Sequence, residues 1–281
     1  MPLKKPRLIS SSTVPIAKAD MIEGMAKGMA VLESFDTQRQ RLNATLAAER
    51  AGITRAAARR HLLTLAHLGY LETDGSYFWL AAKVLRFSGS YLATSRLPRA
   101  VQPTLNRLAV QTRESFSAVV LDGDEVVIVA RSGFEWRRLP DEKMVSAKLL
   151  AYGLHLGARL PTHATSTGRV LLAAKPQNEV SAWLNTRSEN GGLPRLTLNT
   201  VTDPAQLCAL INQVRLDDFN ITSEEHELDV LALAVPLRDM QGRTVAALNV
   251  VSSPQRMTDE TLRRELLPLL LDAARELRPL L

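Results

Sequence analysis

The chain has 281 residues, and its 35 Lys and Arg exceed its 29 Asp and Glu, which gives a formal net charge of +6. No apolar run reaches the length of about 20 residues that a membrane-spanning helix needs, so a membrane protein is excluded. The single cysteine, Cys208, excludes an intrachain disulfide and a multi-cysteine metal site, and it favours a reducing cytoplasm.

The length of the chain predicts two domains, on a scale of about 100–200 residues each. Residues 1–20 are basic, are rich in Ser and Pro, and lack the apolar stretch of a secretion signal, so we predict a disordered arm there. Apolar residues then recur at helical spacing over residues 22–35. This pattern predicts the first helix of a domain that spans residues 21–81.

A helix-turn-helix pattern occupies the middle of this domain. Residues 46–51 predict a short helix closed by a glycine turn, and Thr54 is a suitable N-cap for a second helix over residues 55–67. Ala58 and Leu62 share the face that would pack on the first helix, whereas small and basic side chains near the N-terminus face away. The second helix of such a motif lies in the major groove of DNA. The residues predicted to contact DNA are Thr54, Arg55, Ala56, Ala57, Arg59 and Arg60.

Two further features favour DNA binding. Two short β-prone runs around Asp74-Gly75 predict a hairpin, which makes the motif a winged helix-turn-helix. Residues 1–97 carry 14 basic and 7 acidic residues, whereas residues 98–281 carry 21 and 22. A basic segment binds nucleic acid through counterion release, so double-stranded DNA is the expected partner. The alternative is a chance pairing of two amphipathic helices, and the hairpin and the charge argue against it.

Residues 82–94 resume a helical pattern that Pro98 is expected to end, so we predict a linker helix over residues 82–97. Its apolar stripe is too broad for a solvated linker. We therefore expect the same helix of a second copy to cover it, in a homodimer or a dimer of dimers. A two-fold dimer would bind two half-sites that are spaced by about one turn of DNA or a multiple of it.

Residues 98–281 alternate between helical and strand patterns, which predicts an α+β ligand-sensing domain built on one sheet. Helices are expected at residues 101–112, 168–174, 177–184, 204–217 and 258–280. Strands are expected at residues 115–121, 125–131, 145–150, 219–223, 231–238 and 243–251, and residues 153–162 are expected to be irregular.

The loop over residues 160–168 contains several hydroxyl side chains and leads directly into a predicted helix. Backbone N–H groups at a helix N-terminus have no partner within the helix, and the helix dipole favours an anion there. This pattern predicts that a ligand carboxylate binds at Ser166, Thr167 and Gly168. The alternative is that Thr165 or Ser166 only caps the helix, and the sequence leaves both interpretations open.

An enzyme would need a catalytic constellation. His163 lies near Ser166 in the sequence, and His226 lies within the acidic run of residues 224–229. However, the chain has no nucleophile elbow, no zinc-binding H-E-x-x-H motif and no phosphate-binding loop. We therefore predict no catalytic residue, no metal and no cofactor. A DNA-binding protein that senses no ligand is a second alternative, and it would need no roomy pocket.

Four separated motifs, in this order, resemble the IclR family of transcriptional regulators. They are RAAARRHLLTLAHLGY at 55–70, RLP and TSTGRVLLA at 159–161 and 165–173, EEHE and LAVP at 224–227 and 233–236, and AALNV at 246–250. The similarity covers about residues 22–281 and is greatest to the branch that regulates aromatic-acid catabolism through the β-ketoadipate route. The resemblance implies a winged helix-turn-helix, a linker helix and a GAF-like effector-binding domain. It also implies dimers or tetramers on palindromic operators in the cytoplasm.

The resemblance further implies a ligand pocket in residues 98–281. The expected effector is an aromatic carboxylate, and a short non-aromatic organic acid is the alternative. In this family a glycine usually stands where this chain has Asp229, so the turn there is uncertain, and Asp229 either lines the pocket or lies on the surface. The implied pocket residues are Ser166, Thr167, Gly168, Ala232, Ala234, Asn249 and Val251.

Overall fold

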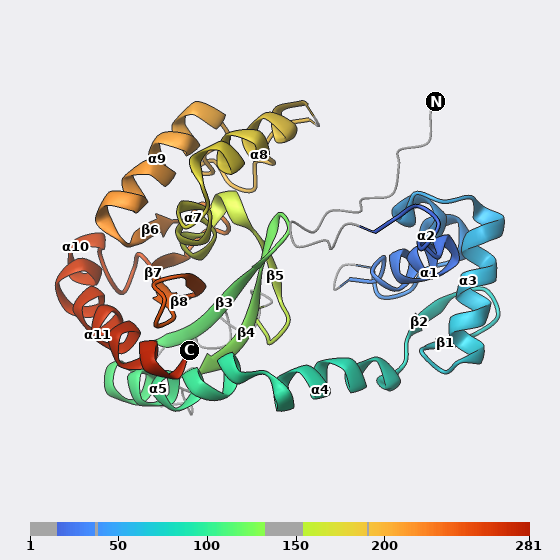
Figure 1. Cartoon of the computed structure of the whole chain (residues 1–281), viewed down its shortest axis with the longest axis horizontal. Coiled ribbons are helices and arrows are strands. Elements are labelled where there is room, and N and C mark those ends of the chain that lie inside the picture. The colour runs from blue at the N-terminus through green and yellow to red at the C-terminus, as the bar shows by residue number, and fades with distance from the viewer. Residues whose placement is uncertain (1–15, 37–38, 133–153, 190) are drawn as a thin grey trace. The chain divides into compact units, whose positions relative to one another are not determined.

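The computed structural model describes residues 16–36, 39–132, 154–189 and 191–281 (Figure 1). Most of the predicted arm and the whole strand expected at residues 145–150 lie outside the described residues. The chain divides into two compact units, Met1–Tyr91 and Leu92–Leu281.

The N-terminal unit has the predicted winged helix-turn-helix. Its helices are α1 (Glu23–Leu32), α2 (Ala44–Ala51) and α3 (Arg55–His67), and its strands are β1 (Leu71–Thr73) and β2 (Phe78–Leu80). Helix α2 begins earlier than expected because the Asn43 side chain accepts hydrogen bonds from the N–H groups of Thr45 and Leu46. It ends at Gly52, whose φ of +65° suits a glycine. All five elements contribute to one core, which includes Val31, Ala47, Leu62, Leu71 and Phe78.

The predicted linker forms a 3₁₀ turn, η1 (Ala82–Val84), and helix α4 (Leu85–Thr94), after which α5 (Arg96–Thr112) begins. The prediction that Pro98 ends the linker helix is wrong, because the helical path breaks at Ser95 instead. Pro98 lies in the first turn of α5, where a proline is tolerated because the backbone N–H has no acceptor within the helix. The boundary between the two units falls inside α4.

Within the described residues, the C-terminal unit contains a six-stranded antiparallel sheet of order β5-β4-β3-β8-β7-β6. Its strands are β3 (Ser115–Asp122), β4 (Glu125–Ser132), β5 (Arg159–Pro161), β6 (Asn220–Ser223), β7 (Leu231–Arg238) and β8 (Thr244–Ser252). Strand β5 lies in the stretch that was expected to be irregular. It is a short edge strand, and its pairing with β4 is a non-local contact.

Helices cover both faces of this sheet (Figure 1), so the α+β prediction is confirmed. Helices α5 and α11 (Leu267–Leu277) pack on one face, and η2 (Thr162–Ala164), α7 (Ser166–Ala173), α8 (Gln177–Glu189) and α9 (Pro204–Asp217) lie on the other. The side chains of β7 point alternately to the two faces of the sheet. Leu231, Leu233 and Val235 enter the core under α5 and α11, whereas Ala232 and Ala234 face α7.

The C-terminal segment is helical without a gap over residues 259–280, close to the predicted 258–280, but its hydrogen bonding changes type along its length. It consists of α10 (Asp259–Thr261), a π-helical turn η3 (Leu262–Leu266), α11 and a final 3₁₀ turn η4 (Arg278–Leu280). The π-helical turn immediately precedes Pro268, whose missing N–H and ring disrupt the α-helical hydrogen bonds of the preceding turn. No helix in the described part of the chain is long and apolar enough to cross a membrane.

Candidate functional site

Helix α3 presents the predicted DNA-contacting residues at its N-terminal end. Thr54 caps the helix, since its Oγ1 accepts a hydrogen bond from the N–H of Ala57 at 3.3 Å. Ala58 and Leu62 are fully buried, whereas Arg55, Arg59 and Arg60 are exposed, as is Ala56, and Ala57 is half-buried. None of these three arginines forms an ion pair with another described residue. Their guanidinium groups are therefore available for phosphates or base edges.

The hairpin that forms the wing is held in shape by local contacts. Its loop runs from Asp74 to Tyr77, and Asp74 Oδ1 accepts hydrogen bonds from the N–H groups of Tyr77 and Ser76. These two hydrogen bonds lower the pKa of the Asp74 carboxyl, and the bond from Tyr77 has the larger effect. Arg41 forms an ion pair with Asp74 at 3.1 Å and lies over the Trp79 ring at 4.3 Å. The wing therefore holds a fixed shape beside the rest of its unit.

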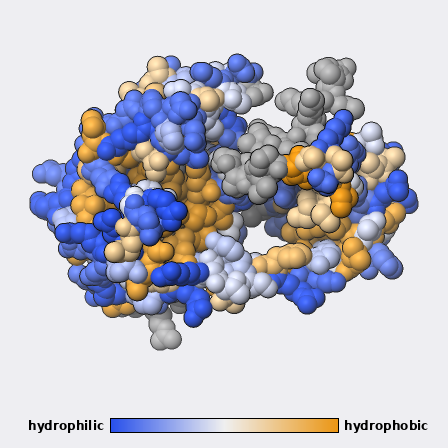
Figure 2. All heavy atoms as spheres, in the orientation of Figure 1, coloured by the Kyte–Doolittle hydropathy of each residue, from blue (hydrophilic) through white to orange (hydrophobic). Residues whose placement is uncertain are grey.

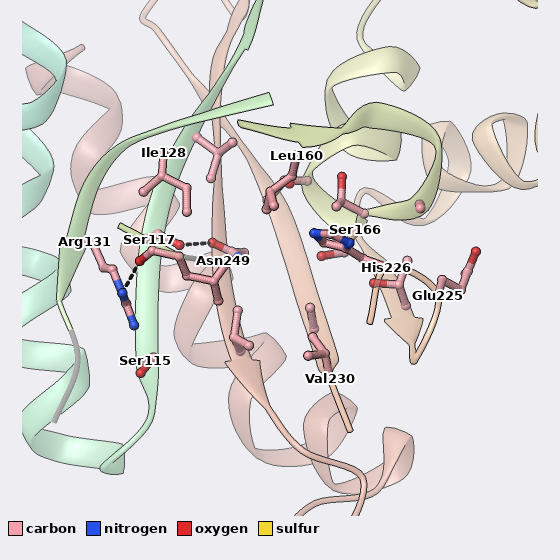
Figure 3. A pocket seen from close by; sticks show the side chains of 18 residues that line it. Ser115, Ser117, Ile128, Arg131, Leu160, Ser166, Glu225, His226, Val230 and Asn249 are labelled. Carbon is pink, nitrogen blue, oxygen red and sulfur yellow. Dashed lines mark hydrogen bonds between the residues drawn. The ribbon is translucent and has the colours of Figure 1, made fainter. Parts of the chain in front are cut away.

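A cavity lies in the C-terminal unit between the sheet and the N-terminus of α7 (Figure 3). The cavity and its open mouth together contain about 630 Å³ of space without protein atoms, part of which is open to solvent. Its walls are largely apolar, with polar groups at opposite ends. Its lining includes Ser115, Ser117, Arg131, Ser166, Glu225, His226, Ala232 and Asn249.

Five of the seven implied pocket residues line this cavity, namely Ser166, Thr167, Ala232, Asn249 and Val251. Ala234 does not line it. Although Ala234 is paired with Asn249 in the sheet, its side chain is fully buried in the core beneath α7. The sequence could place Ala232 and Ala234 on one face of β7, but it could not show how far along the strand the cavity extends.

Gly168, the other implied pocket residue that is missing from the lining, lies outside the cavity. Its N–H donates to Thr165 Oγ1 at 3.2 Å, so Thr165 is the cap of α7. A Cβ atom at Gly168 would lie 2.1 Å from the carbonyl oxygen of Thr162. The glycine is therefore required by the close approach of α7 to the backbone of η2, the turn that directly precedes it in the chain.

The main cavity residue that the sequence did not single out is Arg131, near the end of β4. Its Nη1 donates to the carbonyl oxygen of Leu154, and no described carboxylate forms an ion pair with it. Burial lowers the pKa of its guanidinium, yet arginine stays protonated in proteins. A charged residue at the end of an otherwise apolar strand was the available signal. Ser117, also missed, donates from Oγ to Asn249 Oδ1 at 2.7 Å.

The other end of the cavity is formed by Ser166 and by the acidic run after β6. His226 faces the cavity there beside Ser166 (Figure 3), and its buried Nδ1 has no hydrogen-bond partner among the described residues. Glu225 is neutralised by the buried Arg169, whose Nη1 donates to Glu225 Oε1 at 2.8 Å and whose Nη2 donates to Oε2. This ion pair fixes the acidic run to α7.

His163, the histidine on which the enzyme hypothesis depended, does not contact Ser166 through a hydrogen bond. Its Nε2 lies 2.9 Å from the carbonyl oxygen of Pro194. Burial lowers the pKa of His163, so the neutral imidazole is favoured and its Nε2–H donates to that carbonyl. Among the described residues, no group of three or more His, Cys, Asp or Glu side chains could hold a metal ion. The site offers binding groups rather than a nucleophile and a base.

Asp229 does not line the cavity. It adopts the left-handed conformation with a φ of +63°, which a glycine would adopt more easily. Its N–H donates to Glu224 Oε1, and its Oδ1 accepts a hydrogen bond from Gln255, both at 3.0 Å. The alternative left open by the sequence is thereby resolved, because Asp229 stabilises a turn outside the cavity.

Two family models match the chain across both units. The bacterial transcriptional regulator IclR C-terminal domain matches residues 89–278, and the IclR helix-turn-helix domain matches residues 24–75. The chain belongs to the IclR family of bacterial transcriptional regulators. The resemblance inferred from the four motifs is confirmed, and membership of this family argues against the enzyme hypothesis.

Two curated relatives from Acinetobacter baylyi are similar over almost their whole length. The Pca operon regulatory protein is 47% identical, covering 99% of this chain and 97% of the relative. The p-hydroxybenzoate hydroxylase transcriptional activator is 48% identical, covering 96% and 95%. A solved structure of a double mutant of the PobR inducer-binding domain from Acinetobacter, in complex with 3-hydroxybenzoic acid, is 42% identical with a TM-score of 0.57. That match covers 66% of this chain and 98% of the other.

Proposed function

We propose that this IclR-family regulator controls genes of aromatic-acid catabolism in the cytoplasm and that a small aromatic carboxylate bound in its C-terminal unit changes its affinity for operator DNA. The observation that carries the proposal is the apolar cavity with the Arg131 guanidinium at one end, where no carboxylate of the described residues forms an ion pair with it. Apolar walls with a few convergent polar groups suit a ring that bears a carboxylate. The names of the relatives support the same ligand class.

A thermal-shift experiment on the full chain tests the ligand class. Benzoate and its hydroxy derivatives should raise the melting temperature, because a ligand that binds only the folded state stabilises it by mass action. Pyruvate and succinate serve as the short non-aromatic acids of the alternative. A shift with those acids and none with the aromatic acids would refute the proposal and favour the alternative.

DNA binding should depend on the exposed arginines of α3. The DNA for this test is a duplex obtained by in vitro selection with the parent protein. We expect Arg55→Ala and Arg60→Ala to weaken binding to it by about 1–3 kcal/mol where the arginine contacts a base. Fluorescence anisotropy at several salt concentrations measures this loss and separates base contacts from phosphate contacts. Arg107→Ala in α5 is the control. Unchanged affinity in both α3 variants would remove this helix from the DNA interface.

The apolar residues of α4 should mediate a homodimer. Leu85 is 65% exposed and Tyr91 is 47% exposed, whereas Phe87 stacks on Tyr70 at 5.7 Å and is still 63% exposed. Figure 2 shows apolar atoms at the surface of the N-terminal unit. Burial of such a surface by a second copy is favourable, and a two-fold dimer would place two α3 helices on palindromic DNA.

Light scattering at micromolar concentration should therefore give a mass of two or four chains. The double variant Leu85→Ser, Tyr91→Ser should shift the population towards monomer. Leu228→Ser, at another exposed leucine, should leave the mass unchanged. A parent protein that is monomeric both with and without DNA would contradict this prediction.

A further inference from the structure

The two ends of the cavity differ in charge. Arg131 lies at one end with Ser115 and Ser117 nearby, and His226 and Ser166 lie at the opposite end (Figure 3). Apolar side chains separate the two ends, so a flat ring placed between them would have one edge towards each. The apolar lining consists of Val119, Ile128, Leu154, Leu160, Ala164, Val230, Ala232 and Val251.

The Arg131 end carries a positive charge that no described carboxylate neutralises. A half-buried charge without a counterion costs free energy, and charge-assisted hydrogen bonds from a guanidinium to a carboxylate offset that cost. Arginine is also suited to this task because its planar fork matches the two carboxylate oxygens. The end of the cavity at β4 is therefore built to receive an anion.

The opposite end favours a neutral hydrogen-bonding group. The positive end of a helix dipole amounts to only about half a charge, and here it lies beside the Glu225 carboxylate, which Arg169 already engages. His226 Nδ1 is buried without a hydrogen-bond partner among the described residues. A buried ring nitrogen in that state gains from a hydroxyl group that donates to it or accepts from it.

We propose that Arg131, together with Ser115, binds the carboxylate of the effector and that His226 with Ser166 binds a hydroxyl group at the far side of its ring. The inference rests on the proposed function and narrows its ligand class to a benzoate with a para-hydroxyl group. It also reverses the orientation that the sequence predicted, in which the carboxylate lies at the N-terminus of α7.

The first test compares 4-hydroxybenzoate with its neutral analogue 4-hydroxybenzamide by calorimetry on the full chain. The parent should prefer the acid, and Arg131→Met should weaken binding of the acid by about 10- to 100-fold while changing binding of the amide only slightly. Arg107→Met, at an exposed arginine of α5, is the matched control and should keep the preference. If Arg131→Met prefers the acid over the amide as strongly as the parent does, the carboxylate is wrongly assigned to the Arg131 end of the cavity.

The second test compares 4-hydroxybenzoate with benzoate. The parent should prefer the hydroxylated acid, and His226→Phe, which keeps a ring of similar size, should reduce this preference by about tenfold. Ser166→Ala should reduce it by a smaller factor. If His226→Phe and Ser166→Ala both keep the parent's preference, the hydroxyl end is wrongly assigned.

Failure of the inference can be distinguished from failure of the proposed function. A parent protein that binds neither benzoate nor 4-hydroxybenzoate overturns both. A parent protein that binds these acids, with an acid-over-amide preference that depends on Ser166 rather than on Arg131, overturns the inference alone. That second result would indicate that the effector carboxylate binds at the N-terminus of α7.

Discussion

Gly168→Ala should destabilise the C-terminal unit by about 3 kcal/mol or more, and Gly168→Val should prevent its folding. The added Cβ would lie 2.1 Å from the carbonyl oxygen of Thr162 and 2.6 Å from two further backbone atoms of that residue. Backbone atoms cannot rotate away as a flexible side chain can, so α7 or η2 would have to move. Urea unfolding of the full chain measures the change as a lower midpoint of the C-terminal transition.

Ser166→Ala, two residues earlier in the same helix, is the control for this experiment. Its hydroxyl forms no hydrogen bond with another described residue, so the midpoint should be close to that of the parent. The sequence indicated a different role for Gly168, as part of the site that binds the ligand carboxylate. A Gly168→Ala protein with parental stability that has lost only its ligand would show that the glycine serves the effector after all.

Arg169→Met should cost about 3–5 kcal/mol of stability, since it leaves the Glu225 carboxylate buried without its counterion. Arg169 is 2% exposed at its side chain, and it also donates from Nε to the carbonyl oxygen of His163 at 3.1 Å. The double variant Arg169→Met, Glu225→Leu should recover a large part of the loss, because no charge then remains buried. Urea unfolding of the two single variants and the double variant forms the thermodynamic cycle.

An exposed ion pair of the same unit provides the comparison. Arg159 lies 2.7 Å from Glu125, and both side chains are 45% exposed. Arg159→Met should therefore cost no more than about 1 kcal/mol. Two results would contradict the role of the buried pair. In one, the loss of stability in the double variant equals the sum of the losses in the two single variants. In the other, Arg169→Met costs no more stability than Arg159→Met.

The features that the sequence predicted well are those with local signals. Thr54 caps α3 as expected, and the bounds of α3 and β7 match because apolar periodicity and flanking residues define them within a few positions. The short strand β5 was missed because its three residues, Arg159–Pro161, are too few to show the alternating pattern of a strand.

The cavity residues that the sequence indicated also stand within recognisable sequence motifs. Ser166 and Asn249 stand within motifs that resemble the family, so the resemblance indicated them. Arg131 and His226 face each other across the cavity only because β4 and the acidic run after β6 approach the same side of the sheet. No spacing along the chain encodes this approach. The role of Gly168 was misjudged because no residue pattern marks the turn that brings the backbone of Thr162 against it.

The alternation along β7 gives protein engineers a way to change ligand size without rebuilding the fold. The leucines of this strand lie in the core beneath α5 and α11, whereas Ala232 borders the cavity on the other face. Enlarging Ala232 to valine would occupy space that a ring substituent could fill and would leave the leucine face intact. The ligand pocket and the core therefore lie on separate faces of one strand, which would allow biosensors for larger or smaller acids to be selected from substitutions at a single position.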